Sequence, residues 1–187
     1  VLIKGHYMIL TENEKTLYKT INLYQKKIFR QFLIDAITNN DKESFKSTVK
    51  IIGLQWGVLR TVVKDYGDEN KELEEEASKL KKEHFSSFAE RLWNNRESIL
   101  SGGYSEWTND NHPHSYESKI CFLINPPAFK IIYDSQNKRA LGKPNCKPSE
   151  WQNLVNDYFE DNKFTAFSIE DYFLNDCNLW LKGRAEK

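Results

Sequence analysis

One aspartate and one lysine occupy positions from which their side chains could do chemistry. Asp134 follows the apolar run Ile131-Ile132-Tyr133, at the predicted start of a helix, and Lys119 lies near the start of the preceding apolar helix. A carboxylate at such a helix start either caps the helix or takes part in catalysis. A lysine here is a solvated helix residue, a phosphate contact or a nucleophile. No neighbour in the sequence would lower the pKa of Lys119, which favours the phosphate contact over the nucleophile.

Residues 115–142 form the unit that must position these two side chains. Residues 115–123 predict a helix, Pro126-Pro127 ends it, and residues 135–141 predict a second short helix. Burial behind the preceding apolar residues would strengthen the electrostatic effect of Asp134, at a cost in desolvation.

Helical periodicity extends over the rest of the chain. Residues 11–37 predict a long helix, because Thr11 and Glu14 have the spacing of a capping box. Its apolar stripe, expected to face the core, consists of Leu17, Ile21, Tyr24, Ile28, Phe32 and Leu33. Further helices are predicted at residues 45–63, 68–100, 147–160 and from Ser168 onward, while residues 101–115 predict a long loop. Gly53 and Gly57, four residues apart, would permit close helix packing.

The expected fold is an all-α, two-lobed helical domain of about seven helices. Residues 9–187 would form a single domain with the core unit 115–142, and a cleft would separate this unit from the N-terminal helices. Residues 1–8 are expected to be a tag remnant or an N-terminal extension.

Composition excludes several classes of protein. The chain carries 27 Lys and Arg against 27 Asp and Glu, so no net field attracts it to nucleic acid or membrane. Its three cysteines lack metal-ligand spacing, which predicts a reduced, cytoplasmic protein without structural zinc or any cofactor. No apolar run approaches the ~20 residues of a membrane span, and a monomer is expected.

The central unit resembles a known family. The stretch SKICFLI, the prolines after it, and FKIIYDS followed by KRAL are similar to the core of the helix-hairpin-helix DNA glycosylase superfamily. The family's hairpin is glycine-rich, whereas residues 112–117 here read HPHSYE, and no cysteine-rich iron–sulfur motif is present. The resemblance covers only this unit.

The resemblance implies a helix-hairpin-helix fold and a monofunctional DNA glycosylase, which hydrolyses the N-glycosidic bond of a damaged or modified base and leaves an abasic site. Double-stranded DNA with an extruded base would be the partner. Asp134 would be the catalytic carboxylate, with Lys119 beside it. Glycosylases of antiviral defence, which remove modified cytosines from phage DNA, are one divergent group that the chain looks similar to.

Other residues would complete such a site. The candidates for DNA contacts are Ser115, Tyr116, Lys138, Arg139 and Lys143. The candidates for a base pocket or a wedge are Trp93, Asn95, Arg96, Tyr104, Trp107 and Tyr133. Each aromatic could instead be core, Asn95 and Arg96 could cap a helix, and Arg139 could pair with Asp134 or Glu117. The alternative function is a non-catalytic nucleic-acid-binding or protein-interaction helical module.

Overall fold

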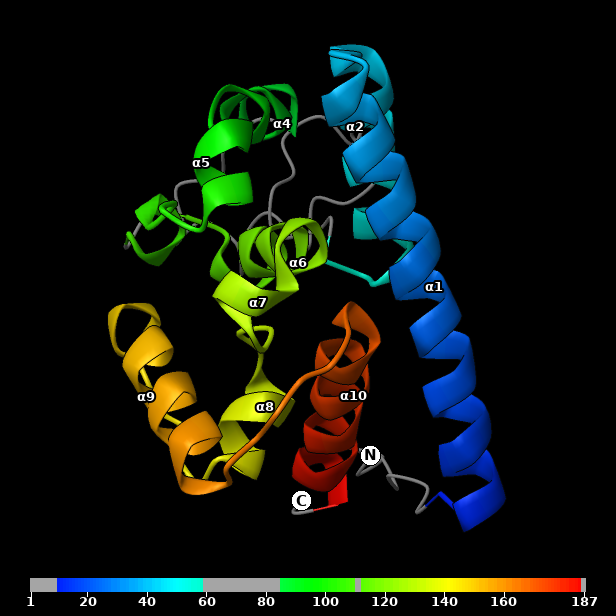
Figure 1. The fold of residues 1–187 in the computed structure, drawn as a ribbon, viewed down its shortest axis with the longest axis vertical. Helices are drawn as coiled ribbons and strands as arrows, with labels where there is room; N and C mark the ends of the chain where they lie inside the picture. The colour runs from blue at the N-terminus through cyan, green and yellow to red at the C-terminus, as the bar shows by residue number, and fades with distance from the viewer. Residues whose placement is uncertain (1–9, 59–84, 110–111, 186–187) are drawn as a thin grey trace, which may run out of the picture.

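The described part of the chain is entirely helical. The computed structural model describes residues 10–58, 85–109 and 112–185, and these contain α-helices and one 3-10 helix but no strand (Figure 1). This confirms the all-α prediction for the described residues. The predicted extension at residues 1–8 lies outside them. The helices are α1 (Glu12–Thr38), α2 (Lys42–Gln55), α4 (Phe85–Asn94), α5 (Arg96–Ser101), η3 (Glu106–Thr108), α6 (His114–Ile124), α7 (Pro126–Phe129), α8 (Ser135–Ala140), α9 (Pro148–Asp161) and α10 (Ile169–Ala185).

Local signals placed the ends of several helices correctly. The Thr11 hydroxyl accepts from the Glu14 N–H at 3.3 Å, and a Glu14 carboxylate oxygen accepts from the Thr11 N–H at 2.7 Å, so the capping box of α1 is confirmed. The proline-started α9 matches its prediction within a residue at each end. Both ends depend on contacts within one turn, which is why the sequence alone suffices for them.

Two predicted helices are shorter than expected. The helix predicted at residues 45–63 already ends at Gln55, where the Trp56 N–H donates to the Ile52 carbonyl and the Gly57 N–H to the Leu54 carbonyl. Residues beyond 58 lie outside the described part. Of the helix predicted at residues 68–100, only residues from 85 onward are described. They form two helices separated at Asn95, whose side chain makes no N-cap hydrogen bond to the second of them, α5.

Helix α6 is the centre of the fold (Figure 1). Its residues 116–124 are all buried, as expected of a helix that packs on every side. Tyr116 reaches α2 so closely that a Cβ on Gly53 would lie 2.2 Å from the tyrosine hydroxyl oxygen. Phe122 packs on the ring of Phe173 in α10 and under the amine of Lys26 in α1. These contacts join α6 to α2, α10 and α1, while the cleft expected between residues 115–142 and the N-terminal helices stays a prediction.

Helices α7, α8 and α10 carry the chain to and around Asp134. The double proline begins the short helix α7, with the Asn125 side chain accepting from the Ala128 N–H at 3.2 Å, instead of leading directly into an extended stretch. Helix α10 then lies between α8 and α1 (Figure 1). A Cβ on Gly183 of α10 would fall 1.8 Å from the Gln136 carbonyl oxygen, so the close packing of α10 on α8 requires glycine.

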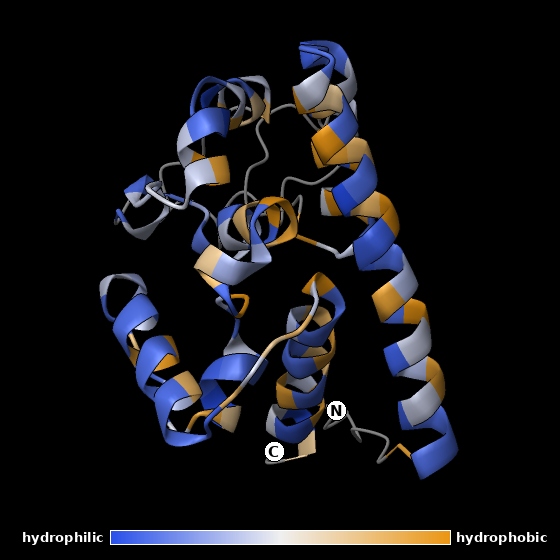
Figure 2. Cartoon of the chain, viewed as in Figure 1, coloured by the Kyte–Doolittle hydropathy of each residue, from blue (hydrophilic) through white to orange (hydrophobic). Residues whose placement is uncertain are grey.

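Helix α1 buries a different face from the predicted one. Its buried residues are Lys26, Phe29, Leu33, Ala36 and Ile37. Of the predicted core stripe only Leu33 is buried, and the other five side chains are exposed. The prediction was wrong because α1 carries apolar residues on two faces, and periodicity does not tell which of them the rest of the chain covers (Figure 2).

Candidate functional site

Asp134 is the N-cap of α8. Its Oδ1 accepts hydrogen bonds from the Gln136 N–H at 2.9 Å and from the Asn137 N–H at 2.8 Å. The residue is half-buried, and it follows three buried residues that bring the chain out of the core. The structural alternative for Asp134 is therefore confirmed. Capping engages only Oδ1, so it does not conflict with a chemical role for Oδ2.

The surroundings raise the pKa of Asp134 above its ordinary value. Burial is the main cause, and the nearby charge of Asp176 acts in the same direction; the charge of Lys119 and the two amide hydrogen bonds oppose both. Although part of its surface is exposed, protein atoms surround the carboxyl group densely enough for desolvation to prevail. Asp134 therefore holds its proton to a higher pH than an ordinary aspartate does.

Lys119 lies close enough to Asp134 for the two charges to act on each other. Its side chain is buried within α6, and Nζ donates to Ser115 Oγ at 2.9 Å and to the Ser115 carbonyl at 3.3 Å. Burial lowers the pKa of Lys119, although the charges of Asp134 and Asp176 oppose the shift. The prediction that nothing lowers this pKa was wrong, because desolvation is invisible in the local sequence.

A buried ion pair holds the segment before Asp134 in place. Lys26 Nζ of α1 donates to Asp176 Oδ2 of α10 at 2.7 Å, and both side chains are almost fully buried. Asp176 Oδ1 in turn accepts from the Ile132 N–H at 3.0 Å and from Asn137 Nδ2 at 2.8 Å. Sequence reasoning missed this arrangement, because residues 150 positions apart leave no local signal.

Ser118 also fixes the position of the extended segment before Asp134. Its hydroxyl oxygen accepts from the Tyr133 N–H at 3.2 Å. Asn137 Nδ2 also donates to the Ile132 carbonyl at 3.0 Å. The extended residues before α8 are thus tied to α6, α8 and α10 at once, which fixes the position of the Asp134 carboxylate.

The predicted DNA contacts divide into two groups. Tyr116 is fully buried and its hydroxyl donates to the Val49 carbonyl, so its prediction as a DNA contact was wrong. The Ser115 hydroxyl is engaged with Lys119. The cations after Asp134 remain at the surface: Lys138 is half-buried over the Tyr133 ring and Lys143 is exposed.

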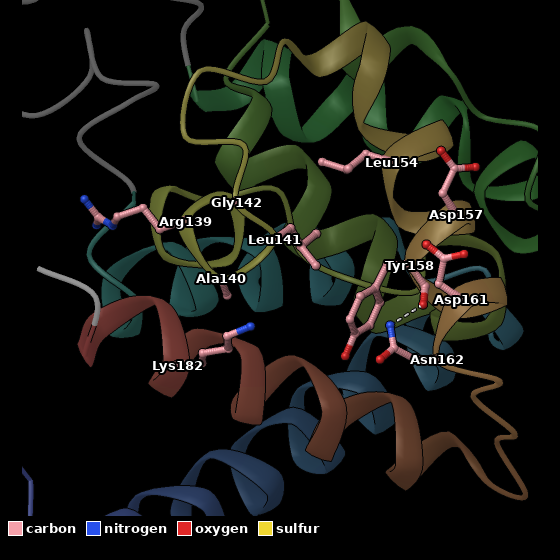
Figure 3. Close-up of a pocket in the computed structure, with 10 residues that line it drawn as sticks. All are labelled: Arg139, Ala140, Leu141, Gly142, Leu154, Asp157, Tyr158, Asp161, Asn162 and Lys182. Carbon is pink, nitrogen blue, oxygen red and sulfur yellow. Dashed lines mark hydrogen bonds between the residues drawn. The ribbon is translucent and has the colours of Figure 1, made fainter.

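Arg139 pairs with neither of the predicted carboxylates among the described residues. Its Nη2 donates to Gln136 Oε1 at 2.8 Å within α8. Arg139 also lines a pocket of about 470 Å³ between α8, α9 and α10, opposite Asp157 and Asp161 of α9, with Lys182 of α10 at the pocket's edge (Figure 3). Asp134 does not line this pocket, which therefore belongs to a different part of the surface.

The aromatic residues predicted for a base pocket or wedge are core residues. Trp93 packs edge-on against Phe45, with ring centroids 5.4 Å apart. Trp107 contacts Tyr133 at 5.9 Å. The side chains of Trp93, Tyr104, Trp107 and Tyr133 are each at most 9% exposed. A wedge must reach the duplex, so that role was wrong for Trp93, Tyr104 and Trp107 in this conformation, and the packing alternative is confirmed for them. The base-pocket role of Tyr133 stays a prediction.

Asn95 and Arg96 lie at the junction between α4 and α5, where their side chains bind carbonyl groups of α4. Asn95 Nδ2 donates to the Arg91 carbonyl at 3.0 Å, and Arg96 Nη1 donates to the Trp93 carbonyl at 3.1 Å. The Arg96 guanidinium also lies over the Trp93 ring, 4.3 Å from its centroid. The capping alternative therefore describes both residues.

A second polar cluster, which we call the Glu117 cluster, is formed by Arg91, Tyr104, His112 and Glu117. Glu117 is fully buried in α6, and its Oε1 accepts from both the Arg91 guanidinium and the Tyr104 hydroxyl. Its Oε2 lies 3.1 Å from His112 Nδ1, and Arg91 Nη1 lies 3.1 Å from the Tyr104 hydroxyl oxygen. In the sequence, Glu117 was considered only as a partner of Arg139, and no local pattern indicates this cluster.

The cluster holds Glu117 in its charged form. Burial alone would raise the pKa of Glu117, but the hydrogen bond with His112, the charge of Arg91 and the Tyr104 hydroxyl together lower it below its ordinary value. Burial, together with the charge and the hydrogen bond of Glu117, raises the pKa of Tyr104, against the opposing charge of Arg91. Each oxygen of the carboxylate has partners, as expected of a structural ion pair.

Comparisons of the chain with known protein families, with curated proteins and with solved structures find no match. Within the described residues, no cluster of three or more His, Cys, Asp or Glu side chains could hold a metal ion. The same residues include no helix with the length and apolar character needed to cross a membrane. The function must therefore be argued from the site.

Proposed function

We propose that the protein is a monofunctional DNA glycosylase with Asp134 as its catalytic carboxylate. One observation carries the proposal. The fold brings Asp134, with a raised pKa, next to Lys119, with a lowered pKa, at the start of a helix. This is the pairing that the resemblance of residues 115–142 to helix-hairpin-helix DNA glycosylases implies.

The chemistry needs a carboxylate beside the sugar. As the bond between the sugar C1′ and the base nitrogen breaks, positive charge develops on the sugar ring, and an ionised Asp134 stabilises it. Since Oδ1 is held by two backbone amides, Oδ2 orients or deprotonates the attacking water. The water oxygen joins C1′, the base leaves with a proton, and an abasic site remains.

Lys119 assists without forming a covalent bond. Its amine donates to the hydroxyl and the carbonyl of Ser115, which hold it in place. From there its charge can support the negative charge of Asp134 or of a phosphate. Borohydride treatment of a reaction mixture should therefore trap no protein–DNA adduct, whereas an adduct would make the enzyme a bifunctional lyase.

Double-stranded DNA with an extruded base is the proposed partner. Lys138 and Lys143 follow Asp134 closely and could hold the backbone beside the extruded nucleotide. The resemblance to defence glycosylases leads us to propose a modified cytosine in phage DNA as the substrate, acted on in the cytoplasm without a cofactor.

The decisive experiment is a search for abasic sites. The protein is incubated with duplexes carrying uracil, alkylated or oxidised purines, or hydroxymethylated and glucosylated cytosine, and alkali then cleaves any abasic site. We expect Asp134→Asn to reduce cleavage at least about 1,000-fold, because an electrostatic group aimed at developing charge contributes on that scale. Asparagine still caps a helix, so the fold should persist.

Asp41→Asn is the matched control. Asp41 caps α2 in the same manner, accepting from the Ser44 N–H at 3.0 Å, far along the chain from Asp134. This variant should retain full activity. Cleavage of none of the substrates, or full activity of Asp134→Asn, would refute the proposal.

A second candidate, a helical protein-interaction module, is favoured by the large apolar side chains that α1 and α2 expose. It is distinguished by DNA affinity at low salt, where phosphate contacts are strongest. No binding under those conditions would favour the interaction module over the glycosylase.

A further inference from the structure

Helix α1 exposes a continuous row of large apolar side chains, which we call the outer stripe. Its members and their exposed fractions are Leu17 59%, Ile21 49%, Tyr24 62%, Ile28 51% and Phe32 58%. At 100° per residue they fall within an arc of about 80° on the helix surface. The buried face of α1 is a separate one, so the helix is apolar on two faces.

The arrangement of the molecule leaves the outer stripe accessible. Helix α1 runs along one edge of the molecule, with α2, α6 and α10 packed on its inner side (Figure 1). Hydrophobic residues recur along the whole length of α1 (Figure 2). Isolated exposed apolar residues are ordinary, but a contiguous row of this size marks an interaction site.

The outer stripe supplies a large part of the area that a stable contact needs. If each of its five side chains presents on the order of 100 Å², the stripe offers about 500 Å². A standard protein interface buries about 800 Å² per partner, so the apolar side chains of the stripe alone supply more than half of that area.

The spacing of the outer stripe is self-complementary. Its first four members are separated by four, three and four residues, the spacing of a coiled-coil seam. The row is also symmetric about a point between Tyr24 and Gln25. In an antiparallel pair of α1 helices, Leu17 would meet Phe32 of the other copy and Ile21 would meet Ile28, while the two Tyr24 rings would lie near the axis.

We propose that the outer stripe binds the outer stripe of a second copy of this chain, in an antiparallel, two-fold symmetric contact between α1 helices. The contact makes the protein a homodimer where the sequence had suggested a monomer. It involves none of the residues assigned to catalysis, so the dimer and the glycosylase activity succeed or fail separately.

Charge placement gives the contact a characteristic salt dependence. The outer stripe ends near Glu14 on one side and Asp35 on the other, and antiparallel pairing brings these carboxylates together at both rims. Salt screens repulsion between exposed charges, so the dimer should become tighter as salt is raised. An association driven by opposite charges would weaken instead.

The first experiment measures molar mass in solution by sedimentation equilibrium. The native chain should be a dimer at micromolar concentration, and the double variant Ile21→Glu/Ile28→Glu should raise the dissociation constant at least about 100-fold, as loss of central interface residues does. Circular dichroism should show unchanged helicity, because both positions are exposed. Thr16→Glu, also exposed on α1 but outside the stripe, should leave the dimer intact.

The second experiment tests the orientation by disulfide cross-linking, with Cys146 replaced by serine because it is partly exposed. Chains carrying Leu17→Cys should cross-link to chains carrying Phe32→Cys and not to one another. Gln25→Cys should cross-link to itself. A parallel pattern would overturn the proposed geometry.

A monomeric native chain would overturn the proposal altogether. So would a dimer that survives the two glutamates, since another surface would then hold it. If the chain is monomeric and the outer stripe binds an amphipathic helix of another protein, the stripe is a binding site for that protein and the proposed self-association is refuted.

Discussion

The two carboxylates of the central unit, Glu117 and Asp134, differ in what surrounds them. Glu117 is completely enclosed, and Arg91, Tyr104 and His112 supply partners for both of its oxygens. Asp134 is half-buried and has two amide partners on a single oxygen. The pKa of Glu117 is lowered and that of Asp134 is raised, although burial acts in the same direction on both.

The difference separates a structural carboxylate from a reactive one. Partners that satisfy a buried charge stabilise the fold around it and leave no lone pair for a substrate. Desolvation without full compensation keeps a carboxylate in a higher-energy charged state, and functional sites commonly contain such groups. The comparison therefore assigns stability to the Glu117 cluster and chemistry to Asp134, and each assignment can be tested.

The largest expected effect follows from removing the charge of Glu117. Glu117→Gln should lower the free energy of unfolding by about 3 kcal/mol, because it leaves the part-buried Arg91 guanidinium without this carboxylate. Urea denaturation measures the change. Glu106→Gln, at an exposed glutamate of η3, is the control and should change stability by less than about 0.5 kcal/mol. A loss below about 1 kcal/mol in Glu117→Gln would remove the structural role.

Neutralising Asp134 should have a smaller effect of the opposite sign. Because burial disfavours its charge, Asp134→Asn at neutral pH should raise the free energy of unfolding, by up to about 1 kcal/mol, while activity is lost. The amide retains the cap of α8. Destabilisation comparable to that of Glu117→Gln would show that the two carboxylates play the same structural part.

The pH dependence of stability is the finest test. The folded-state pKa of Glu117 lies below its ordinary value of 4.5, so its stabilisation is present above pH 4.5 and is lost as pH falls through the lowered pKa. The folded-state pKa of Asp134 lies above its ordinary value of 3.8, so its stabilisation is present below pH 3.8 and is lost as pH rises through the raised pKa.

Each variant compared with the native chain isolates one of these contributions. Unfolding free energies measured across the acidic range should give differences that change in opposite directions with pH for Glu117→Gln and Asp134→Asn. Parallel curves would mean that the two carboxylates share one environment, which would contradict the comparison.

Much of the helix pattern could be predicted, because it depends on contacts within a turn or two. The Thr11–Glu14 capping box, Asp134 as a helix N-cap and the proline-started α9 all follow from adjacent residues. The break at Asn95 was missed, since its side chain bonds back into α4 instead of capping α5. By contrast, which side chains are buried depends on neighbours distant in sequence.

The candidate site was predicted only in part for the same reason. Lys119 and Asp134 were identified as residue types at suggestive positions, and the fold does place their charges near each other. The aromatic side chains proposed to reach DNA pack in the core of the protein. An aromatic residue at helical spacing gives the same sequence pattern whether its side chain faces the core or a ligand. The Lys26–Asp176 pair that holds the site could not be foreseen.

By itself, the sequence determined that the described chain is helical, where most helices begin, and that Asp134 opens one of them. Short-range hydrogen bonds and side-chain periodicity carry that information. Only the tertiary structure decided which apolar face of α1 is buried and which charges are desolvated. Those outcomes depend on partners that meet only when distant segments pack together, such as Asp176 for Lys26 and Arg91 for Glu117. Burial also changes the free energy of a charged side chain far more than the residues adjacent to it in sequence do.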